Sequence, residues 1–140
     1  MIQPLTIKQM KEWGKKMPFN TLLGIRPVRA HKDGLTIECT VRKELLNSAS
    51  VLHGGVTATM ADAAAGMAIT RLTGGKKRIT TIEMKLNYFR PVAEGTIRAR
   101  AYVIRLGSQI AVARVDLHDH QKNLAGAALV TYMILGDATH

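Results

Sequence analysis

A carboxylate within an otherwise uncharged segment is the first feature that could do chemistry. Asp62 lies inside the run Thr59-Met60-Ala61-Asp62-Ala63-Ala64-Ala65, which favours helix and leaves the acid far from any cap. A buried carboxylate without a partner is costly, so Asp62 either points to solvent or lines a polar cavity. The scarcity of other charges nearby favours the cavity, where Asp62 would act as a general base or as a nucleophile.

Two adjacent glycines stand where this helix is expected to begin. A backbone N–H at Gly54 would lack a partner within the helix and would lie at the positive end of the helix dipole, where it can hold an oxyanion. Without a Cβ at Gly54 or Gly55, an acyl group can also approach the backbone closely. Taken alone, the glycines would more simply mark a tight turn, and the nearby Asn47 and His53 could be ordinary loop residues. The chemical interpretation depends on all of them together with Asp62.

Two helices are predicted to organise the first half of the chain. The helix that carries Asp62 is the one long helix expected, and Gly74-Gly75 should stop it. Its many small side chains suit close enclosure by a curved sheet. A short amphipathic helix is predicted over residues 6–16, from Ile7, Met10 and Trp13 at helical spacing, and Pro18 should end it.

The remaining elements are predicted to be strands. Residues 22–30 and 35–41 read as a hairpin around Asp33-Gly34, and four more strands are expected over 79–89, 95–106, 109–117 and 124–135. Ile82, Met84, Leu86 and Tyr88 alternate with polar residues, which is typical of a half-buried strand. The sequence therefore predicts one α+β domain over residues 1–140, with an N-terminal helical segment over about 1–17 and one antiparallel sheet around one helix.

Charge and composition restrict the partners. Twenty Lys and Arg against ten Asp and Glu give a net charge of +10, which favours an anionic ligand. The basic residues are dispersed, with Lys76-Lys77-Arg78 as the tightest run, and aromatic residues make up only 4% of the chain, so nucleic acid is disfavoured. A phosphorylated small molecule such as coenzyme A would use the same field with fewer contacts.

Several other features predict a cytoplasmic protein without a metal. The most apolar stretch, residues 51–72, is interrupted by His53 and Asp62, so no membrane span is expected, and the N-terminus lacks the apolar block of a signal peptide. The single cysteine, Cys39, fits a reducing compartment and is expected to be structural. His118-Asp119-His120 is interpreted as a turn rather than a metal site.

A longer pattern joins these candidates. Asn47-x5-His53-Gly54-Gly55-x-Thr57-Ala58-x3-Asp62, followed by Tyr88-Phe89-Arg90-Pro91, resembles the PaaI-type acyl-CoA thioesterases of the hotdog superfamily over about residues 22–135. The resemblance implies the hotdog fold, hydrolysis of acyl-CoA to free acid and CoA, no cofactor beyond the CoA of the substrate, and a homo-oligomer, dimer or tetramer.

The resemblance also implies roles for individual residues. The Gly54 amide would polarise the thioester carbonyl, Asp62 would activate water or attack directly, and Asn47 and His53 would position the thioester and the leaving thiolate. Thr81 matches a Ser or Thr that assists the water in this family. Strand parity, however, places Thr80 rather than Thr81 on the face of Ile82 and Met84.

Substrate contacts and a shared site complete the prediction. The expected substrate-binding residues are apolar or glycine for the acyl group, and basic for the CoA phosphates: Gly55, Leu46, Met60, Tyr88, Lys76, Lys77, Arg78 and Arg90. Gly54 and Asp62 are eight positions apart, about 12 Å along a helix, so one thioester would reach both only if they came from two subunits related by a twofold axis. The alternative function is a non-catalytic module that binds acyl-CoA or an acyl carrier.

Overall fold

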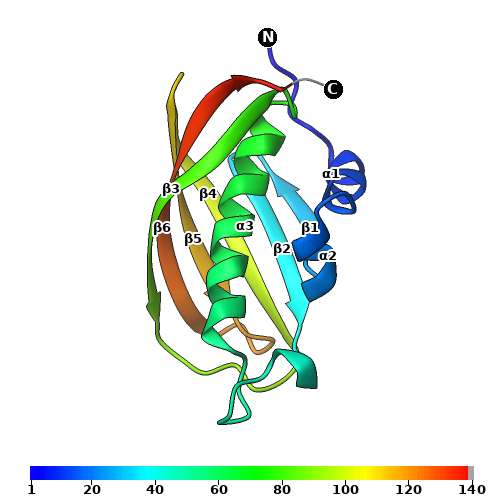
Figure 1. The fold of residues 1–140 in the computed structure, drawn as a ribbon, viewed down its shortest axis with the longest axis vertical. Coiled ribbons are helices and arrows are strands. Elements are labelled where there is room, and N and C mark those ends of the chain that lie inside the picture. The colour runs from blue at the N-terminus through cyan, green and yellow to red at the C-terminus, as the bar shows by residue number, and fades with distance from the viewer. Residues whose placement is uncertain (139–140) are drawn as a thin grey trace.

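A computed structural model describes residues 1–138 of the chain (Figure 1). The helices are α1 (Ile7–Gly14), α2 (Pro18–Leu23) and α3 (Gly54–Leu72), with a short 3-10 turn over Lys43–Leu45. The strands are β1 (Arg26–His31), β2 (Gly34–Thr40), β3 (Lys77–Tyr88), β4 (Thr96–Leu106), β5 (Ile110–His118) and β6 (Leu124–Asp137). Within residues 1–138, the helices are all too short or too polar to cross a membrane.

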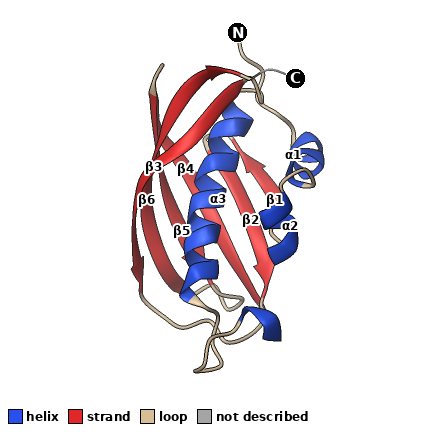
Figure 2. Cartoon of the chain, in the orientation of Figure 1, coloured by secondary structure: helices blue, strands red, loops and turns tan. Residues whose placement is uncertain are grey.

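The six strands form one antiparallel sheet that curves around α3 (Figure 2). The strand order is β1-β2-β4-β5-β6-β3, so β3 pairs with β6 and not with β4, its neighbour in sequence. The chain therefore crosses from one edge of the sheet toward the other between β3 and β4, and β3 becomes an edge strand. The arrangement confirms the predicted α+β class and the hotdog layout of one long helix wrapped by a curved sheet.

Small side chains let α3 lie close to the sheet. Alanines on the inner face of the helix and alanines on the facing strands are fully buried: Ala61, Ala64, Ala65 and Ala68 on α3, and Ala99, Ala101, Ala111 and Ala113 on β4 and β5. A methyl group on each side keeps the two backbones near each other while still excluding water. The other face of α3 is only partly covered, since Ala58, Thr59, Asp62 and Ala63 are half-buried.

The N-terminal segment differs from the prediction at Pro18. The first helix is confirmed, and Thr6 caps it by accepting a hydrogen bond from the Gln9 amide. Pro18, however, begins a second helix at a position where proline's missing N–H costs nothing. The strand predicted from residue 22 is therefore wrong at its start: α2 ends at Leu23, and Gly24, with φ of 76°, turns the chain into β1.

A register irregularity in β3 reverses the predicted parity of that strand. The pairing with β6 shifts between Thr81 and Glu83. Before the shift Ile79 packs against the core, and after it Met84 and Leu86 do, whereas Ile82 is 48% exposed. The prediction that Ile82 shares a face with Met84 is wrong, because a β-bulge adds one residue and moves the following side chains to the opposite face.

Candidate functional site

His53 caps the start of α3 and decides which glycine amide stays available. Its Nδ1 accepts a hydrogen bond of 2.8 Å from the Gly55 N–H. A ring nitrogen that accepts carries no proton, so in neutral His53, which is an exposed residue, the proton lies on Nε2, which can donate. Gly54 is the first helical residue and has no acceptor within the helix for its N–H. Among the hydrogen bonds of residues 1–138, the uncommitted amide at the positive end of α3 is therefore that of Gly54.

Close contacts, and not unusual backbone angles, explain why both residues are glycine. A Cβ on Gly55 would lie 2.9 Å from His53 Nδ1 and would disturb the cap. A Cβ on Gly54 would lie 3.3 Å from the hydroxyl of Tyr88, which donates a 2.7 Å hydrogen bond to the Gly54 carbonyl. The end of β3 is thus fastened to the start of α3, and the interpretation of the glycines as a tight turn is not needed.

A hollow of about 340 Å³ lies beside the Gly54 amide. Asn47, Gly54, Tyr88 and Arg90 all line it. The side-chain oxygen of Asn47 accepts hydrogen bonds from the amides of Ala49 and Val51 and so orders its own loop. Its NH₂ group remains as a donor toward a ligand. The hollow therefore combines three kinds of donor suited to a carbonyl or a phosphate: a backbone amide, a side-chain amide and a guanidinium.

Asp62 lies half-buried on the partly covered face of α3 and is held by two hydroxyl groups. Thr81 Oγ1 donates to its Oδ1 at 2.8 Å, and the hydroxyl of Tyr132 donates to the same oxygen at 2.6 Å. Thr81 and Tyr132 are directly opposite each other on β3 and β6, which explains why they converge. The structure thus brings Thr81, and not Thr80, to Asp62, because the bulge follows Thr81.

Tyr132 is a residue of the site that the sequence reasoning missed. It sits on a strand whose other residues read as ordinary apolar core, and it is 7% exposed. Burial and the neighbouring carboxylate raise the pKa of Tyr132 far above its usual range, so its hydroxyl stays protonated and donates. The available signal was Gly66, an isolated glycine in an alanine-rich helix, since glycine weakens a helix interior and a packing contact can be the reason for it.

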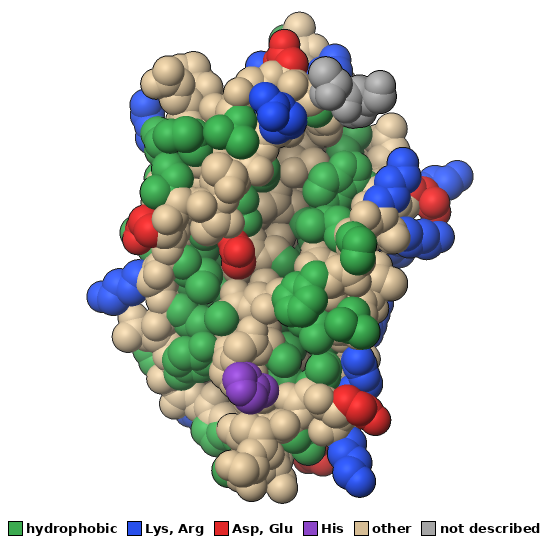
Figure 3. Space-filling model, in the orientation of Figure 1, with side chains coloured by type: hydrophobic (Ala, Val, Ile, Leu, Met, Phe, Trp, Pro, Cys, Tyr) green, Lys and Arg blue, Asp and Glu red, His purple; other side chains and the backbone are tan. Residues whose placement is uncertain are grey.

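An apolar groove runs beside Asp62 along the open face of α3. Its part next to the carboxylate has about 340 Å³ and is lined by Met17, Phe19 and Met84, among others. An adjoining hollow of about 580 Å³ continues toward Trp13 and the start of β3. Figure 3 shows hydrophobic side chains gathered on both sides of the band of small groups along α3. One wall comes from the N-terminal helices and the other from β3.

The structure brings only some of the predicted residues together. Asn47, His53, Gly54, Gly55, Tyr88 and Arg90 gather at the start of α3, and Thr81 joins Asp62. Asp62 and Gly54 line different hollows, as their separation along the helix requires.

Other predicted contacts lie elsewhere. Lys77, which pairs with Asp137 at 2.6 Å, and Arg78 line the hollow near the end of α3, far along β3 from Arg90. Lys76 is exposed beside them. Met60 is fully buried in the core and therefore contacts no groove in this chain. Leu46 is half-buried and bridges to Leu52 in the loop before α3.

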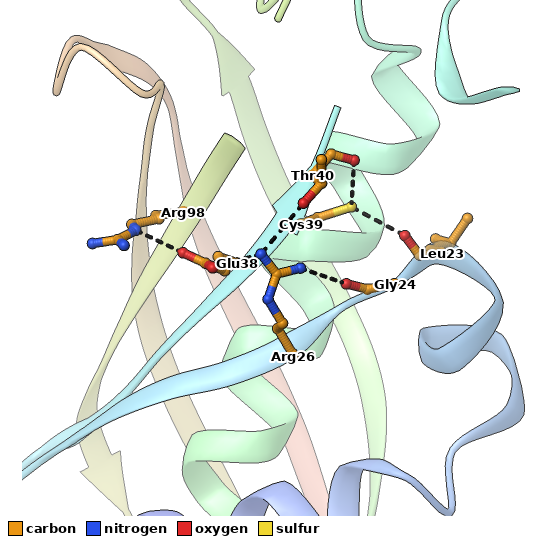
Figure 4. A network of polar contacts seen from close by, with 7 residues as sticks. All are labelled: Leu23, Gly24, Arg26, Glu38, Cys39, Thr40 and Arg98. Carbon is orange, nitrogen blue, oxygen red and sulfur yellow. Dashed lines mark hydrogen bonds and ion pairs between the residues drawn. The ribbon is translucent and has the colours of Figure 1, made fainter. Parts of the chain in front are cut away.

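Cys39 and the His118-Asp119-His120 turn have structural places. The thiol of Cys39 donates to the Leu23 carbonyl at 3.2 Å (Figure 4). Cys39 is fully buried, and burial raises the pKa of its thiol. Next to it, Arg26 and Arg98 both pair with Glu38 on the outer face of the sheet. One Asp119 oxygen accepts from the amides of Gln121 and Asn123, which orders the turn between β5 and β6.

Comparison with known proteins points to one family. Residues 49–133 match the family described as the thioesterase superfamily. The medium/long-chain acyl-CoA thioesterase YigI of Escherichia coli (strain K12) is 32% identical over 133 residues, covering 84% of this chain and 86% of that protein. A solved structure of a thioesterase superfamily protein is 30% identical, with a TM-score of 0.85 and coverage of 91% and 97% of the two chains. A thioesterase from Haemophilus influenzae shares the fold with a TM-score of 0.88 at 23% identity, over 100% of this chain and 99% of that one.

Proposed function

Since this chain belongs to the thioesterase superfamily, we propose that it hydrolyses acyl-CoA thioesters to the free acid and coenzyme A at a site shared between two subunits. Thioester hydrolysis is the activity of the family, and the acyl-CoA substrate is the one printed in the name of the E. coli relative. The observation that carries the proposal is the uncommitted Gly54 amide at the start of α3, beside a hollow with Asn47 and Arg90.

The proposed chemistry follows from the hydrogen bonds around the two groups. The Gly54 N–H binds the thioester oxygen and stabilises the charge that develops there. With Asp62 as a base, water attacks the carbonyl carbon and its proton passes to the carboxylate. The tetrahedral intermediate then collapses, the C–S bond breaks, and the CoA thiolate leaves. With Asp62 as a nucleophile, the carboxylate attacks the carbonyl carbon, the C–S bond breaks, and the CoA thiolate leaves behind a mixed anhydride. Water then cleaves the anhydride to the free acid and the Asp62 carboxylate. His53 Nε2–H is a suitable donor to the departing sulfur.

A shared site is supported by helix geometry and by the sheet edge. Gly54 and Asp62 are about 12 Å apart along α3, too far for one thioester group. Strand β3 is a twelve-residue edge strand, and such long edges are templates for pairing with another chain. If two copies of β3 pair antiparallel about a twofold axis, the two α3 helices also run in opposite directions. Gly54 of one subunit then faces Asp62 of the partner subunit.

The same pairing suggests where the acyl group and the CoA phosphates of the substrate would bind. The apolar groove beside Asp62, with Met17, Phe19 and Met84, suits the acyl group. Lys77 and Tyr88, at the two ends of β3, are about 35 Å apart at about 3.3 Å per residue. Antiparallel pairing would place Lys76, Lys77 and Arg78 of one subunit near Arg90 of the other. A basic cluster assembled in this way suits the phosphates of CoA.

The test is release of thiol from a panel of short-, medium-, long-chain and aryl-CoA substrates, without added metal. We expect release from at least one medium- or long-chain substrate. Asp62→Asn should lower kcat at least about 100-fold, the usual scale of general-base loss. Asp116→Asn, which removes a carboxylate on β5 paired with Arg114, is the matched control and should keep its activity. Saturable binding of acyl-CoA without release of thiol would instead support a non-catalytic binding module.

A further inference from the structure

We propose that Tyr132 is a positioning residue that, together with Thr81, holds Asp62 by one carboxylate oxygen and leaves the other free to react, and that Gly66 is glycine in order to admit it. The inference deepens the proposed function, on which it rests. Neither Tyr132 nor Gly66 belongs to the pattern of residues that suggested the activity.

The two carboxylate oxygens of Asp62 have different surroundings. Oδ1 accepts from Tyr132 at 2.6 Å and from Thr81 at 2.8 Å. Among the hydrogen bonds of residues 1–138, none reaches Oδ2. Two donors from adjacent strands thus hold the position of Oδ1. Oδ2 is therefore the oxygen that would receive the proton of water, or would attack.

Tyr132 is itself held in place by burial of its ring and by the contacts of its hydroxyl group. Its ring is buried on the inner face of β6, and its hydroxyl also lies 2.8 Å from the backbone carbonyl of Asp62. The hydroxyl has one proton, and the shorter contact is to the carboxylate. Because burial and Asp62 raise the pKa of Tyr132, it keeps that proton throughout the working pH range. Tyr132 also borders the groove beside Asp62, but its hydroxyl acts on the reaction through the carboxylate that it holds.

Gly66 supplies the space for this contact. It lies one helical turn after Asp62, on a helix in which most neighbouring small residues are alanine. A Cβ at Gly66 would lie 2.5 Å from the Tyr132 hydroxyl oxygen and 3.0 Å from Cζ. Glycine disfavours a helix interior, and its backbone here has a negative φ that any residue could adopt. The close approach of Tyr132 is therefore what excludes alanine.

The test compares Tyr132→Phe with Tyr102→Phe. Tyr102 lies on the outer face of the sheet between the guanidinium groups of Arg100 and Arg114, so its hydroxyl is remote from Asp62 and its loss should leave activity unchanged. Tyr132→Phe should lower kcat about tenfold or more, as expected for a lost hydrogen bond to a charged group, and should leave KM within about twofold.

Gly66→Ala tests the second half of the proposal. It should reproduce the loss of kcat, and it should cost less in the Tyr132→Phe background, where the clashing oxygen is absent. If Gly66→Ala does not fold, Tyr132→Phe and Thr81→Val still decide. A wild type that releases no thiol refutes the proposed function. An active wild type whose Tyr132→Phe variant keeps its kcat overturns the positioning role alone.

Discussion

At the scale of single residues, one hydrogen bond often decides what a neighbouring group can do. Because His53 Nδ1 accepts from the Gly55 amide, the Gly54 amide stays uncommitted and Nε2 keeps the proton. Because two hydroxyl groups donate to Asp62 Oδ1, Oδ2 is the oxygen left for the proposed reaction. The direction of proton flow in the proposed reaction is thus set before any substrate binds.

Arg90 is predicted to contact the phosphates of CoA. It is exposed and lines the hollow beside Gly54, where it would contact the phosphates of CoA in the ground state and the transition state alike. Arg90→Ala should therefore raise KM for acyl-CoA about tenfold while kcat stays within about twofold, measured by initial rates of thiol release. Arg105→Ala, at the exposed end of β4, is the control for lost charge. An equal rise in KM for both variants would mean that the general field, and not a contact, is responsible.

At the scale of elements, the sequence predicted what local signals determine. The bounds of α3 and of strands β3 to β6 lie within about two residues of the predicted ones, since glycine stops and alternation are properties of adjacent residues. Proline at position 18 was compatible with both ending a helix and starting one, and the choice depends on packing.

The parts of the site that could not be predicted depend on distant residues. The bulge after Thr81 is set by the pairing of β3 with β6, and it lets Thr81 face Asp62 while Met84 and Leu86, further along the strand, still pack against the core. Tyr132 meets Asp62 across 70 positions of sequence, a contact with no local signature. Conversely, Asn47, His53, Gly54 and Asp62 could be singled out because they follow one another along a single loop and helix.

Helix α2 is predicted to form one wall of the acyl-binding groove. Its Phe19 is 58% exposed and lines the groove beside Asp62, so it would contact the acyl group. Phe19→Ala should raise KM for a long-chain acyl-CoA several-fold and leave the KM for acetyl-CoA within about twofold, because only the longer chain reaches that wall. Leu22→Ala, which removes an exposed apolar side chain of the same helix outside the groove, is the control. A uniform change for all chain lengths would remove α2 from the acyl site.

At the scale of the whole molecule, the open face of α3 and the edge strand β3 belong to one surface. The strand that would pair with a second copy runs beside α3 (Figure 1), and the groove that would take the acyl group lies on the same side of the molecule. In the proposed dimer, pairing of the strands and completion of the active site are therefore a single event. The dimer would hold two equivalent sites, each with one half from either chain.

Mixing two inactive variants tests that arrangement. Asp62→Asn removes the carboxylate, and the side chain in Gly54→Val would block access to the amide. After subunit exchange, each mixed dimer would hold one site with both defects and one with neither. About a quarter of the wild-type activity should return, since half the dimers would be mixed and half of their sites intact. A mixture that mass measurement shows to contain heterodimers, but which stays inactive, would place both groups in one chain.

Because Cys39 is buried, its reaction with a thiol reagent would measure how often the fold opens. It is the only thiol in the chain, and its raised pKa and full burial keep it from a thiol reagent while the sheet is closed. Without substrate, we expect slow reaction in native buffer and rapid reaction of one thiol per chain in denaturant. Fast labelling of the native protein would contradict this. One thiol-detecting reagent would thus report the release of CoA when acyl-CoA is present and the exposure of Cys39 by opening of the fold when it is absent. The rates of turnover and of opening can therefore be measured with the same assay.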